Sequence, residues 1–355
     1  MTTTGHIEEI DSFRALAIAL VAGFHYYKAF FPQASSPILF GWTGVDLFFV
    51  ISGFVLFLQF KRRYLSHGTV HYRTYFRNRF LRIAPAFYVA LLAEVLVFHP
   101  VALLSLPVLC HLTFTHMATY DIAYSIMPIY WTLAVEAEFY VFLILFGRIF
   151  LDNRGYLILL VITALSVVYR YVVSASFGFS HTGVLLINHL PGRFAEFCFG
   201  IALAKLYLHS GRWEALAGGW MRKACLVAAG VVIYAWCAHL WLKGGDPIFN
   251  SVPVSTAFHP LVGLAFSLIM LPLMSLRGRM KALMRFRPVV FLGLISYSLY
   301  LWHMFALKMV MGIPAFMSLP WPGLQFSGAL GIAVLWAAAS YYLIERTFLK
   351  FRASS

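Results

Sequence analysis

The sequence predicts an all-α membrane protein, a helical bundle of about ten transmembrane helices. Of its 355 residues only 11% are charged, whereas a soluble domain carries about 25%. The mean hydropathy is +0.81, and apolar runs near 20 residues, the length that crosses a bilayer, recur along the chain. Because no long polar stretch interrupts them, we expect residues 1–355 to form a single integral membrane domain.

Ten apolar segments are long enough to be spans. They are 10–31, 42–60, 80–98, 131–150, 155–174, 188–208, 222–242, 256–276, 288–312 and 322–345. The loop after the second segment, between Lys61 and Arg82, holds Lys and Arg residues and no acid, which places it in the cytoplasm. Both termini are then cytoplasmic as well.

An eleventh apolar stretch, residues 101–118, is interpreted as re-entrant or as lying against the bundle. It contains Pro107, His111 and His116 and follows Pro100. If it crossed the membrane, every later basic loop would face outward, against the positive-inside rule.

Charge and cysteine content exclude other classes. The formal net charge is +14, but the basic residues lie in short loops between apolar runs, so we expect contacts with membrane lipids and no nucleic acid. The four cysteines show no metal-ligand spacing, and no metal site is predicted. The N-terminus carries Glu8, Glu9 and Asp11, so the first span is expected to be retained rather than cleaved as a signal peptide.

The first span carries a stripe of ionisable residues, Asp11, Arg14 and His25. On a helix, the eleven steps from Arg14 to His25 leave the side chains about 20° apart and roughly 16 Å apart along the axis. Such residues inside a membrane mark a functional site by default. His25 is either a base, because an imidazole can take a proton from a hydroxyl group at neutral pH, or a packed histidine bonded to a neighbouring backbone or hydroxyl group. Arg14 suits an anionic ligand, a pair with Asp11, or snorkelling to the interface.

The segment GWTGVDLFFVISGF, residues 41–54, combines glycines with an acid. Gly41, Gly44 and Gly53 allow another helix to approach closely. Asp46 lies just inside the apolar run, where it either caps the helix or orients a histidine.

Two further segments place charges at span ends. Arg79 and Arg82 are three residues apart, share a helix face, and suit either a phosphate ligand or lipid phosphates. Glu136 and Glu138 lie inside the fourth span, where they need a partner such as Arg14, Arg193 or His25.

The remaining polar positions favour structural roles. Arg193 and Glu196 are spaced to pair with each other. Ser296, Tyr300 and His303 in SYSLYLWH are expected to join helices. Phosphate-loop, GxSxG, HExxH and Rossmann signatures are absent. The residues alone leave two classes open, an intramembrane enzyme with a histidine base and an anionic ligand, or a transporter with a buried proton relay.

Seven motifs occur in an order and spacing that resemble those of acyltransferase family 3. They are IDSFRALAIALVAGFH, GWTGVDLFFVISGF, RFLRIAP, WTLAVEAEFY, RFAEFCFG, SYSLYLWH and YYLIERTF, and they cover the chain from Ile10 to Phe348. The family comprises integral membrane acyltransferases, including O-acetylases of O-antigen and exopolysaccharides. The resemblance implies ten spans in a bacterial inner membrane and transfer of an acyl group, usually acetyl from acetyl-CoA, to a carbohydrate hydroxyl.

The resemblance also implies roles for single residues. Arg14 and His25 match the essential first-helix pair, Asp11 and Asp46 match carboxylates of the first two spans, and Arg79 and Arg82 match arginines of the third. Glu136 matches the glutamate of the fourth-span motif, while Ala137 and Glu138 depart from the usual Glu-Gln. We therefore predict His25, Arg14, Glu136, Asp46 and Asp11 as catalytic residues and Arg79, Arg82 and Arg14 as residues that hold the phosphates of acyl-CoA.

Some family members carry a fused extracytoplasmic domain, and none is expected here. The acceptor remains open between O-antigen, exopolysaccharide, a lipid-linked glycan and a glycosylated small molecule such as a macrolide. The alternative function is a proton-coupled exporter or flippase of a glycan or lipid. Appearance of an acyl ester on the glycan distinguishes the enzyme from the exporter.

Overall fold

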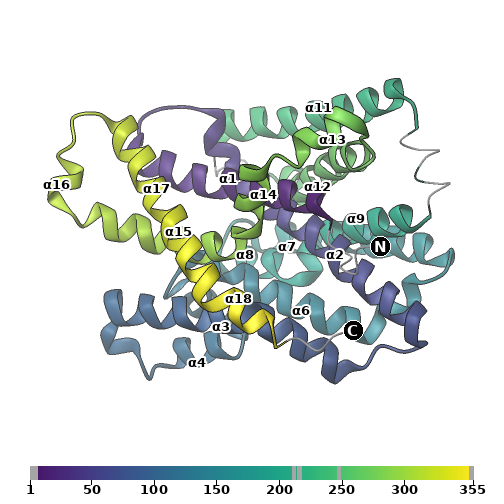
Figure 1. Cartoon of the computed structure of the whole chain (residues 1–355), viewed down its shortest axis with the longest axis horizontal. Coiled ribbons are helices and arrows are strands. Elements are labelled where there is room, and N and C mark those ends of the chain that lie inside the picture. Colours follow the sequence, from purple (N-terminus) through teal and green to yellow (C-terminus); the bar gives the residue numbers. More distant parts are fainter. Residues whose placement is uncertain (1–6, 210–212, 214–217, 246–248, 352–355) are drawn as a thin grey trace. The chain divides into compact units, whose positions relative to one another are not determined.

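A computed structural model describes residues 7–209, 213, 218–245 and 249–351. The terminal residues themselves therefore lie outside the described part of the chain. Within that part every regular element is a helix, which confirms the all-α prediction (Figure 1). The chain divides into two compact units, and each is described by itself. Unit 1 contains residues 1–51, 206–243 and 262–339, and unit 2 contains residues 52–205, 244–261 and 340–355.

Unit 1 is assembled from three separate stretches of the chain. Its elements are α1 (Glu8–Phe30), η1 (Pro37–Thr43), the start of α2 (Gly44–His67), α11 (Trp220–Gly244), the second half of α12 (Val252–Met274), α13 (Gly278–Met284), α14 (Arg287–Leu294), α15 (Ser296–Met311), α16 (Pro314–Met317) and most of α17 (Pro322–Ser340).

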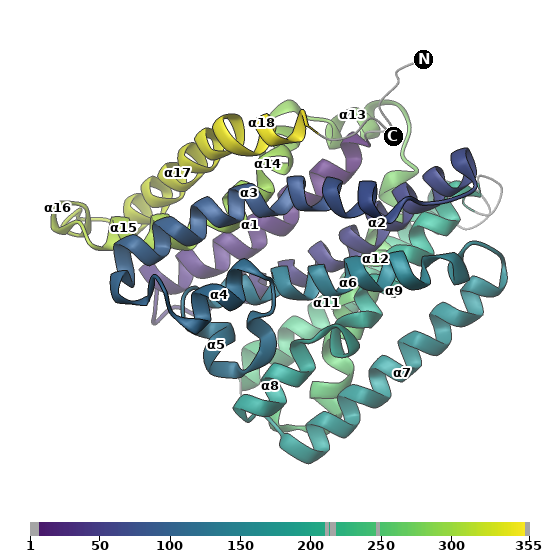
Figure 2. The same ribbon diagram turned by 90° about the horizontal axis from the view of Figure 1, so that it is seen from below.

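Helix α1 is the centre of unit 1, and small residues let its neighbours touch its backbone. A Cβ atom at Gly44 would lie 2.4 Å from the Ala17 carbonyl oxygen, and one at Gly293 would lie 1.8 Å from that of Asp11. Only glycine fits at these two positions. Helices α1 and α14 accordingly run side by side in both views (Figures 1 and 2).

The short helix α13 and Arg285, which follows it, form ion pairs with the first turn of α1. The Glu9 carboxylate lies 3.0 Å from the Lys281 ammonium group and 3.0 Å from the Arg285 guanidinium group. Arg285 also lies 3.1 Å from Glu8. Burial raises the pKa of Glu9, but the hydrogen bond from Lys281 and the two positive charges outweigh burial, so the pKa is lowered.

Unit 2 is mostly one continuous stretch. Its elements are the remainder of α2, α3 (Tyr72–Phe98), η2 (Pro100–Ala102), α4 (Leu106–Leu112), η3 (His116–Ala118), α5 (Tyr120–Tyr124), η4 (Pro128–Tyr130), α6 (Trp131–Phe146), η5 (Gly147–Phe150), α7 (Arg154–Phe177), α8 (His181–Asn188), α9 (Leu190–Leu208), the first half of α12, the π-helical turn Tyr341–Glu345 and α18 (Arg346–Leu349).

Two buried cations of unit 2, Arg170 and Lys205, are satisfied by backbone carbonyl groups. Arg170 in α7 is 1% exposed and donates to the carbonyl oxygens of Thr256 and Gly192, at 3.0 and 2.9 Å. Lys205 in α9 is also 1% exposed and donates to the carbonyl oxygen of Asp152 at 2.6 Å. A buried charge is costly without such partners, so both side chains join the segments that supply the carbonyls.

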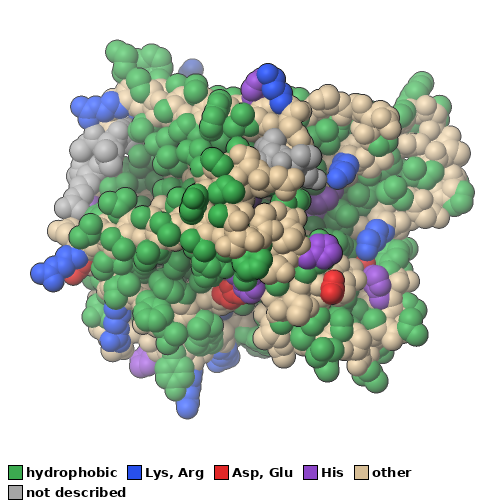
Figure 3. All heavy atoms as spheres, turned by 180° about the vertical axis from the view of Figure 1, so that it is seen from behind, with side chains coloured by type: hydrophobic (Ala, Val, Ile, Leu, Met, Phe, Trp, Pro, Cys, Tyr) green, Lys and Arg blue, Asp and Glu red, His purple; other side chains and the backbone are tan. Residues whose placement is uncertain are grey.

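The outer faces of several helices are apolar. Leu157, Leu160, Leu165, Val168 and Val172 of α7 are each more than half exposed. Their three- to five-residue spacing places them along one side of the helix. Hydrophobic side chains also cover much of the face in Figure 3. A surface of this kind suits contact with lipid chains rather than with water.

Six helices of the described residues are long and apolar enough to cross a membrane: α2 with η1, α3, α7, α11, α12 and α17 with its continuation. A seventh candidate is the pair α14 and α15. Each of the ten predicted spans coincides with at least one helix. Helices α1, α6 and α9, however, are too short or not apolar enough to count among these candidates. A multi-pass membrane protein is confirmed, while the count of ten and the cytoplasmic termini remain predictions.

Two segments differ from a straight span. In the stretch 101–118, α4 has seven residues, about 10 Å of helix, which is too short to cross a bilayer. The predicted span 288–312 is broken, because Ile295 leaves helical geometry (φ −88°, ψ 4°), and α14 and α15 meet at 72°.

Candidate functional site

The predicted stripe of α1 lies on one unbroken helix. Arg14 Nη1 donates to Asp11 Oδ1 at 3.1 Å. The Asp11 side chain is 1% exposed and that of Arg14 is 24% exposed. Of the three roles considered for Arg14, the structure contains the pair with Asp11. The guanidinium-bearing side chain nevertheless keeps an accessible portion, since about a quarter of it is exposed.

His25 lies eleven residues further along α1 and is partly exposed. Its Nδ1 atom lies 2.9 Å from the carbonyl oxygen of Val21, one turn back. The same atom lies 3.2 Å from Nε2 of His303 in α15. The imidazole is therefore held in place through Nδ1.

Asp46 lies in the first turn of α2 and is fully buried. The helix dipole stabilises a carboxylate at a helix N-terminus. The position of Asp46 therefore agrees with the first of its two predicted roles, stabilising the start of this helix. The structure brings Asp11, Arg14, His25 and Asp46 into unit 1.

The predicted phosphate-binding arginines belong to α3 in unit 2, and both have protein partners. Arg79 donates to the side-chain carbonyl of Gln59, and its guanidinium carbon lies 5.7 Å from the ring centre of Tyr75 and 5.9 Å from that of Tyr140. Arg82 forms an ion pair with Glu345, which is fully buried. The positive charge of Arg82 would therefore be shared between a phosphate ligand and the Glu345 carboxylate.

Glu136 in α6 is bound by hydroxyl groups. Its Oε1 atom accepts from Ser52 Oγ at 3.0 Å and from Tyr140 Oη at 2.8 Å. Arg79 lies over the Tyr140 ring, so these residues form one network in unit 2. The sequence named Arg14, Arg193 and His25 as partners and missed the hydroxyls, because hydroxyl-bearing residues are common in membrane helices and give no distinctive signal.

Glu138 and Glu196, two other acids that the sequence analysis named, have structural partners. Glu138 Oε1 lies 2.7 Å from Nδ1 of His189, and Oε2 accepts from the Leu190 backbone N–H at 2.8 Å, where α9 begins. Glu196 accepts from Arg193 at 3.2 Å, as its spacing predicted.

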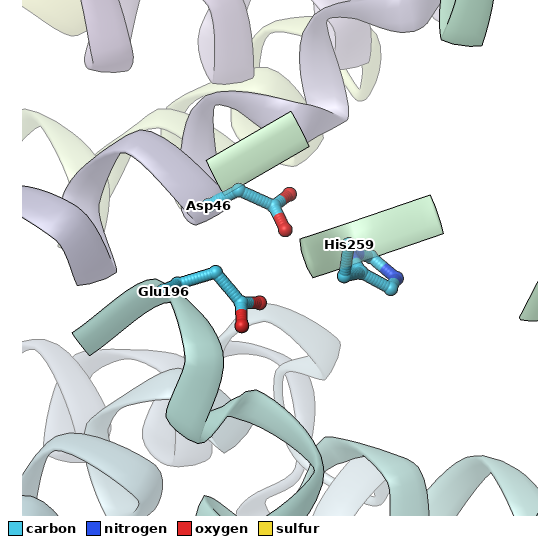
Figure 4. Close-up of side chains that lie close together, drawn as sticks. All are labelled: Asp46, Glu196 and His259. Atoms are coloured by element: carbon cyan, nitrogen blue, oxygen red, sulfur yellow. The ribbon is translucent and has the colours of Figure 1, made fainter. Parts of the chain in front are cut away.

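Glu196 has a second neighbour that the sequence did not single out. Figure 4 shows its carboxylate, from α9, turned toward the imidazole of His259, from α12. A ligand atom of each lies within 4.8 Å of the other, and both residues are buried in unit 2. Two ligands do not make a structural metal site, which needs about four. Asp46, also drawn there, belongs to unit 1.

His303 is the other residue whose place the sequence did not reveal. SYSLYLWH was interpreted as joining helices, and Tyr26 Oη does donate to the His303 carbonyl oxygen at 2.8 Å. The His303 ring, however, faces His25 across 278 residues of sequence. Helical spacing relates residues within one segment, so it cannot report a contact between distant segments.

The chain matches the family model described as an acyltransferase domain over residues 7–343. It is 22% identical to the peptidoglycan O-acetyltransferase OatA of Listeria monocytogenes, over 84% of this chain and 49% of that protein. It is 26% identical to the exopolysaccharide production protein ExoZ of Rhizobium meliloti, over 87% of this chain and 90% of that protein. The chain thus spans about half the length of the first of these relatives. No solved structure matches it.

Proposed function

Because this chain belongs to acyltransferase family 3 and is an O-acyltransferase of the membrane, we propose that it moves an acetyl group from acetyl-CoA to a carbohydrate hydroxyl. The names of its relatives support peptidoglycan or exopolysaccharide as the acceptor class. A lipid-linked glycan, O-antigen and a glycosylated small molecule share the same sugar hydroxyl chemistry. We assign the chain to the bacterial inner membrane as one multi-pass domain.

The proposal depends most on the surroundings of His25. This imidazole is partly exposed, while its Nδ1 is engaged by the Val21 carbonyl oxygen at 2.9 Å. A carbonyl oxygen only accepts, so Nδ1 carries the hydrogen and the neutral ring has its lone pair on Nε2. A nitrogen lone pair on a partly exposed histidine is what a general base or a nucleophile needs.

Two sequences of steps use this lone pair. In the first, Nε2 takes the proton of the sugar hydroxyl, the oxygen attacks the thioester carbon, and the CoA sulfur leaves with the carbon–sulfur electron pair and then receives the proton. In the second, Nε2 attacks the thioester carbon and the CoA sulfur leaves with the carbon–sulfur electron pair. The sugar oxygen then attacks the acyl-histidine, the carbon–nitrogen electron pair returns to Nε2, and the hydroxyl proton passes to the CoA sulfur. Both give an O-acetyl ester and CoA thiol, and both need His25.

The other predicted residues have supporting roles in this proposal. Arg14, Arg79 and Arg82 supply positive charge to the CoA phosphates from the cytoplasmic side. Asp11 holds Arg14. Asp46, in the same unit as His25, stabilises the positive charge that His25 acquires during transfer, and Glu136 is kept as a predicted catalytic residue of unit 2. No metal takes part in this scheme.

The test is acetyl transfer by purified protein in lipid nanodiscs, with radiolabelled acetyl-CoA and a candidate glycan. We expect His25→Ala to lose transfer by at least about 100-fold, because general acid–base catalysis contributes about 10²–10⁴-fold. The variant should keep the elution profile and Tm of the parent. Undiminished transfer by this variant would remove His25 from the mechanism, and export of an unmodified glycan would favour a transporter.

A further inference from the structure

Two histidines of unit 1, His25 and His303, form a directed pair. Nδ1 of His25 and Nε2 of His303 are 3.2 Å apart, their ring centres are 5.1 Å apart, and the ring planes meet at 49°. His25 comes from α1 and His303 from α15. A nitrogen–nitrogen distance of 3.2 Å is at the long end of the range for a hydrogen bond.

The direction of this bond follows from the other partners of each ring. Nδ1 of His303 lies 2.8 Å from the Tyr300 carbonyl oxygen and 3.1 Å from that of Leu299. Both atoms only accept, so Nδ1 of His303 carries the hydrogen and its Nε2 is a lone pair. Nδ1 of His25 then faces two acceptors, the Val21 carbonyl oxygen and Nε2 of His303, and it must be the donor to both.

Burial separates the roles of the two rings. His303 is 0% exposed, whereas His25 is partly exposed. A second proton on His303 would place a charge on a fully buried ring, which is costly. A substrate therefore meets His25 and does not reach His303.

We propose that His303 is a positioning residue for His25. It accepts the Nδ1 hydrogen of His25 alongside the Val21 carbonyl oxygen, supports the tautomer that has its lone pair on Nε2, and stabilises the imidazolium that forms when Nε2 takes the hydroxyl proton. No proton is transferred to His303. The inference rests on the proposed function, since it assigns a role relative to His25 as base or nucleophile.

The competing interpretation is that His303 only packs α15 against α1. Unit 1 offers a control, because Tyr26 also joins these helices through its hydroxyl and the His303 carbonyl oxygen at 2.8 Å. Tyr26→Phe removes one hydrogen bond between the helices and leaves both imidazoles in place. A purely packing role predicts the same outcome for changes at either residue.

The experiment compares His303→Gln with His303→Asn. The Gln amide reaches the place of imidazole Nε2 and offers a carbonyl oxygen there, whereas the shorter Asn amide ends near the place of Nδ1. We expect His303→Asn to lower kcat by about 10–100-fold, the value of a hydrogen bond to a charged group. We expect His303→Gln to recover most of that loss and KM for acetyl-CoA to stay within about threefold in both.

Tm of each variant is measured beside kcat. Tyr26→Phe should lower Tm while retaining kcat. Equal kcat in the Asn and Gln variants, or a kcat loss in Tyr26→Phe that equals the loss in His303→Asn, would overturn the inference. His25→Gln is assayed in parallel: an active His25→Gln variant contradicts the proposed function itself, whereas an inactive one beside a fully active His303→Asn contradicts only the role of His303.

Discussion

Charged side chains of this protein are stabilised by three kinds of partner. Arg170 and Lys205 are buried and use backbone carbonyls. Asp11 and Arg14 pair within one turn of a helix. Arg82 and Glu345 pair between α3 and the π-helical turn that follows α17. This last ion pair bears on function, because the sequence also predicts that Arg82 binds a phosphate of CoA.

A double-mutant cycle separates these two roles of Arg82. Replacing Arg82 by Gln removes this partner from the buried Glu345 carboxylate, and replacing Glu345 by Gln removes it from Arg82. Each change should lower stability by about 1–3 kcal/mol. The double variant should lose less than the sum, because both charges are gone. Thermal unfolding in detergent measures these terms.

Kinetics of the same variants complete the cycle. If Arg82 binds phosphate, Arg82→Gln raises KM for acetyl-CoA about tenfold, whereas Glu345→Gln leaves KM unchanged or lowers it. Equal KM values in the two single variants would remove Arg82 from the donor site.

At the scale of elements, α1 is positioned by close backbone contacts. The start of α2 and α14 each place a glycine on its backbone, at Gly44 and Gly293. The approach at Gly293 is at the level of Asp11, one turn before Arg14. The predicted charge stripe is therefore set by helix packing as well as by the ion pair.

Gly293→Ala tests this contact. Its Cβ would lie 1.8 Å from the Asp11 carbonyl oxygen, so the helices must move apart, and we expect a loss of about 1–3 kcal/mol or more. Gly331→Ala in α17 is the matched control, because nothing lies within 4 Å of a Cβ there. Alanine at that helical position should be neutral or stabilising. The same Tm for both variants would contradict the packing described for α14.

For the whole molecule, the distribution of basic loops predicts ten spans. It places the loop after α2 in the cytoplasm and the region between α3 and α6 outside, provided that residues 101–118 do not cross. Exposed serines mark both regions, Ser66 at the end of α2 and Ser125 after α5.

Single-cysteine variants measure this topology. In a background without the four native cysteines, an impermeant maleimide should label Ser125→Cys in intact spheroplasts and Ser66→Cys only after lysis. Labelling of Ser125→Cys only after lysis would mean that residues 101–118 cross the membrane. The opposite pattern at both positions would invert the whole topology.

The sequence by itself determined the helical membrane class, the positions of the helices and the family. Apolar run length and loop charge report directly on the bilayer, and the motifs lie in order along the chain. Short-range pairs such as Asp11–Arg14 and Arg193–Glu196 were also predictable, because helical spacing alone brings their side chains together.

Tertiary structure alone decided the long-range partners. Three such contacts are His303 beside His25, the Ser52 hydroxyl on Glu136, and Glu345 beside Arg82, and they join residues 84 to 278 positions apart. It also decided the break at Ile295 inside a run that hydropathy presents as one span. The physical reason is the same in each case: periodicity describes one helix, whereas a partner on another helix is chosen by packing of the whole unit.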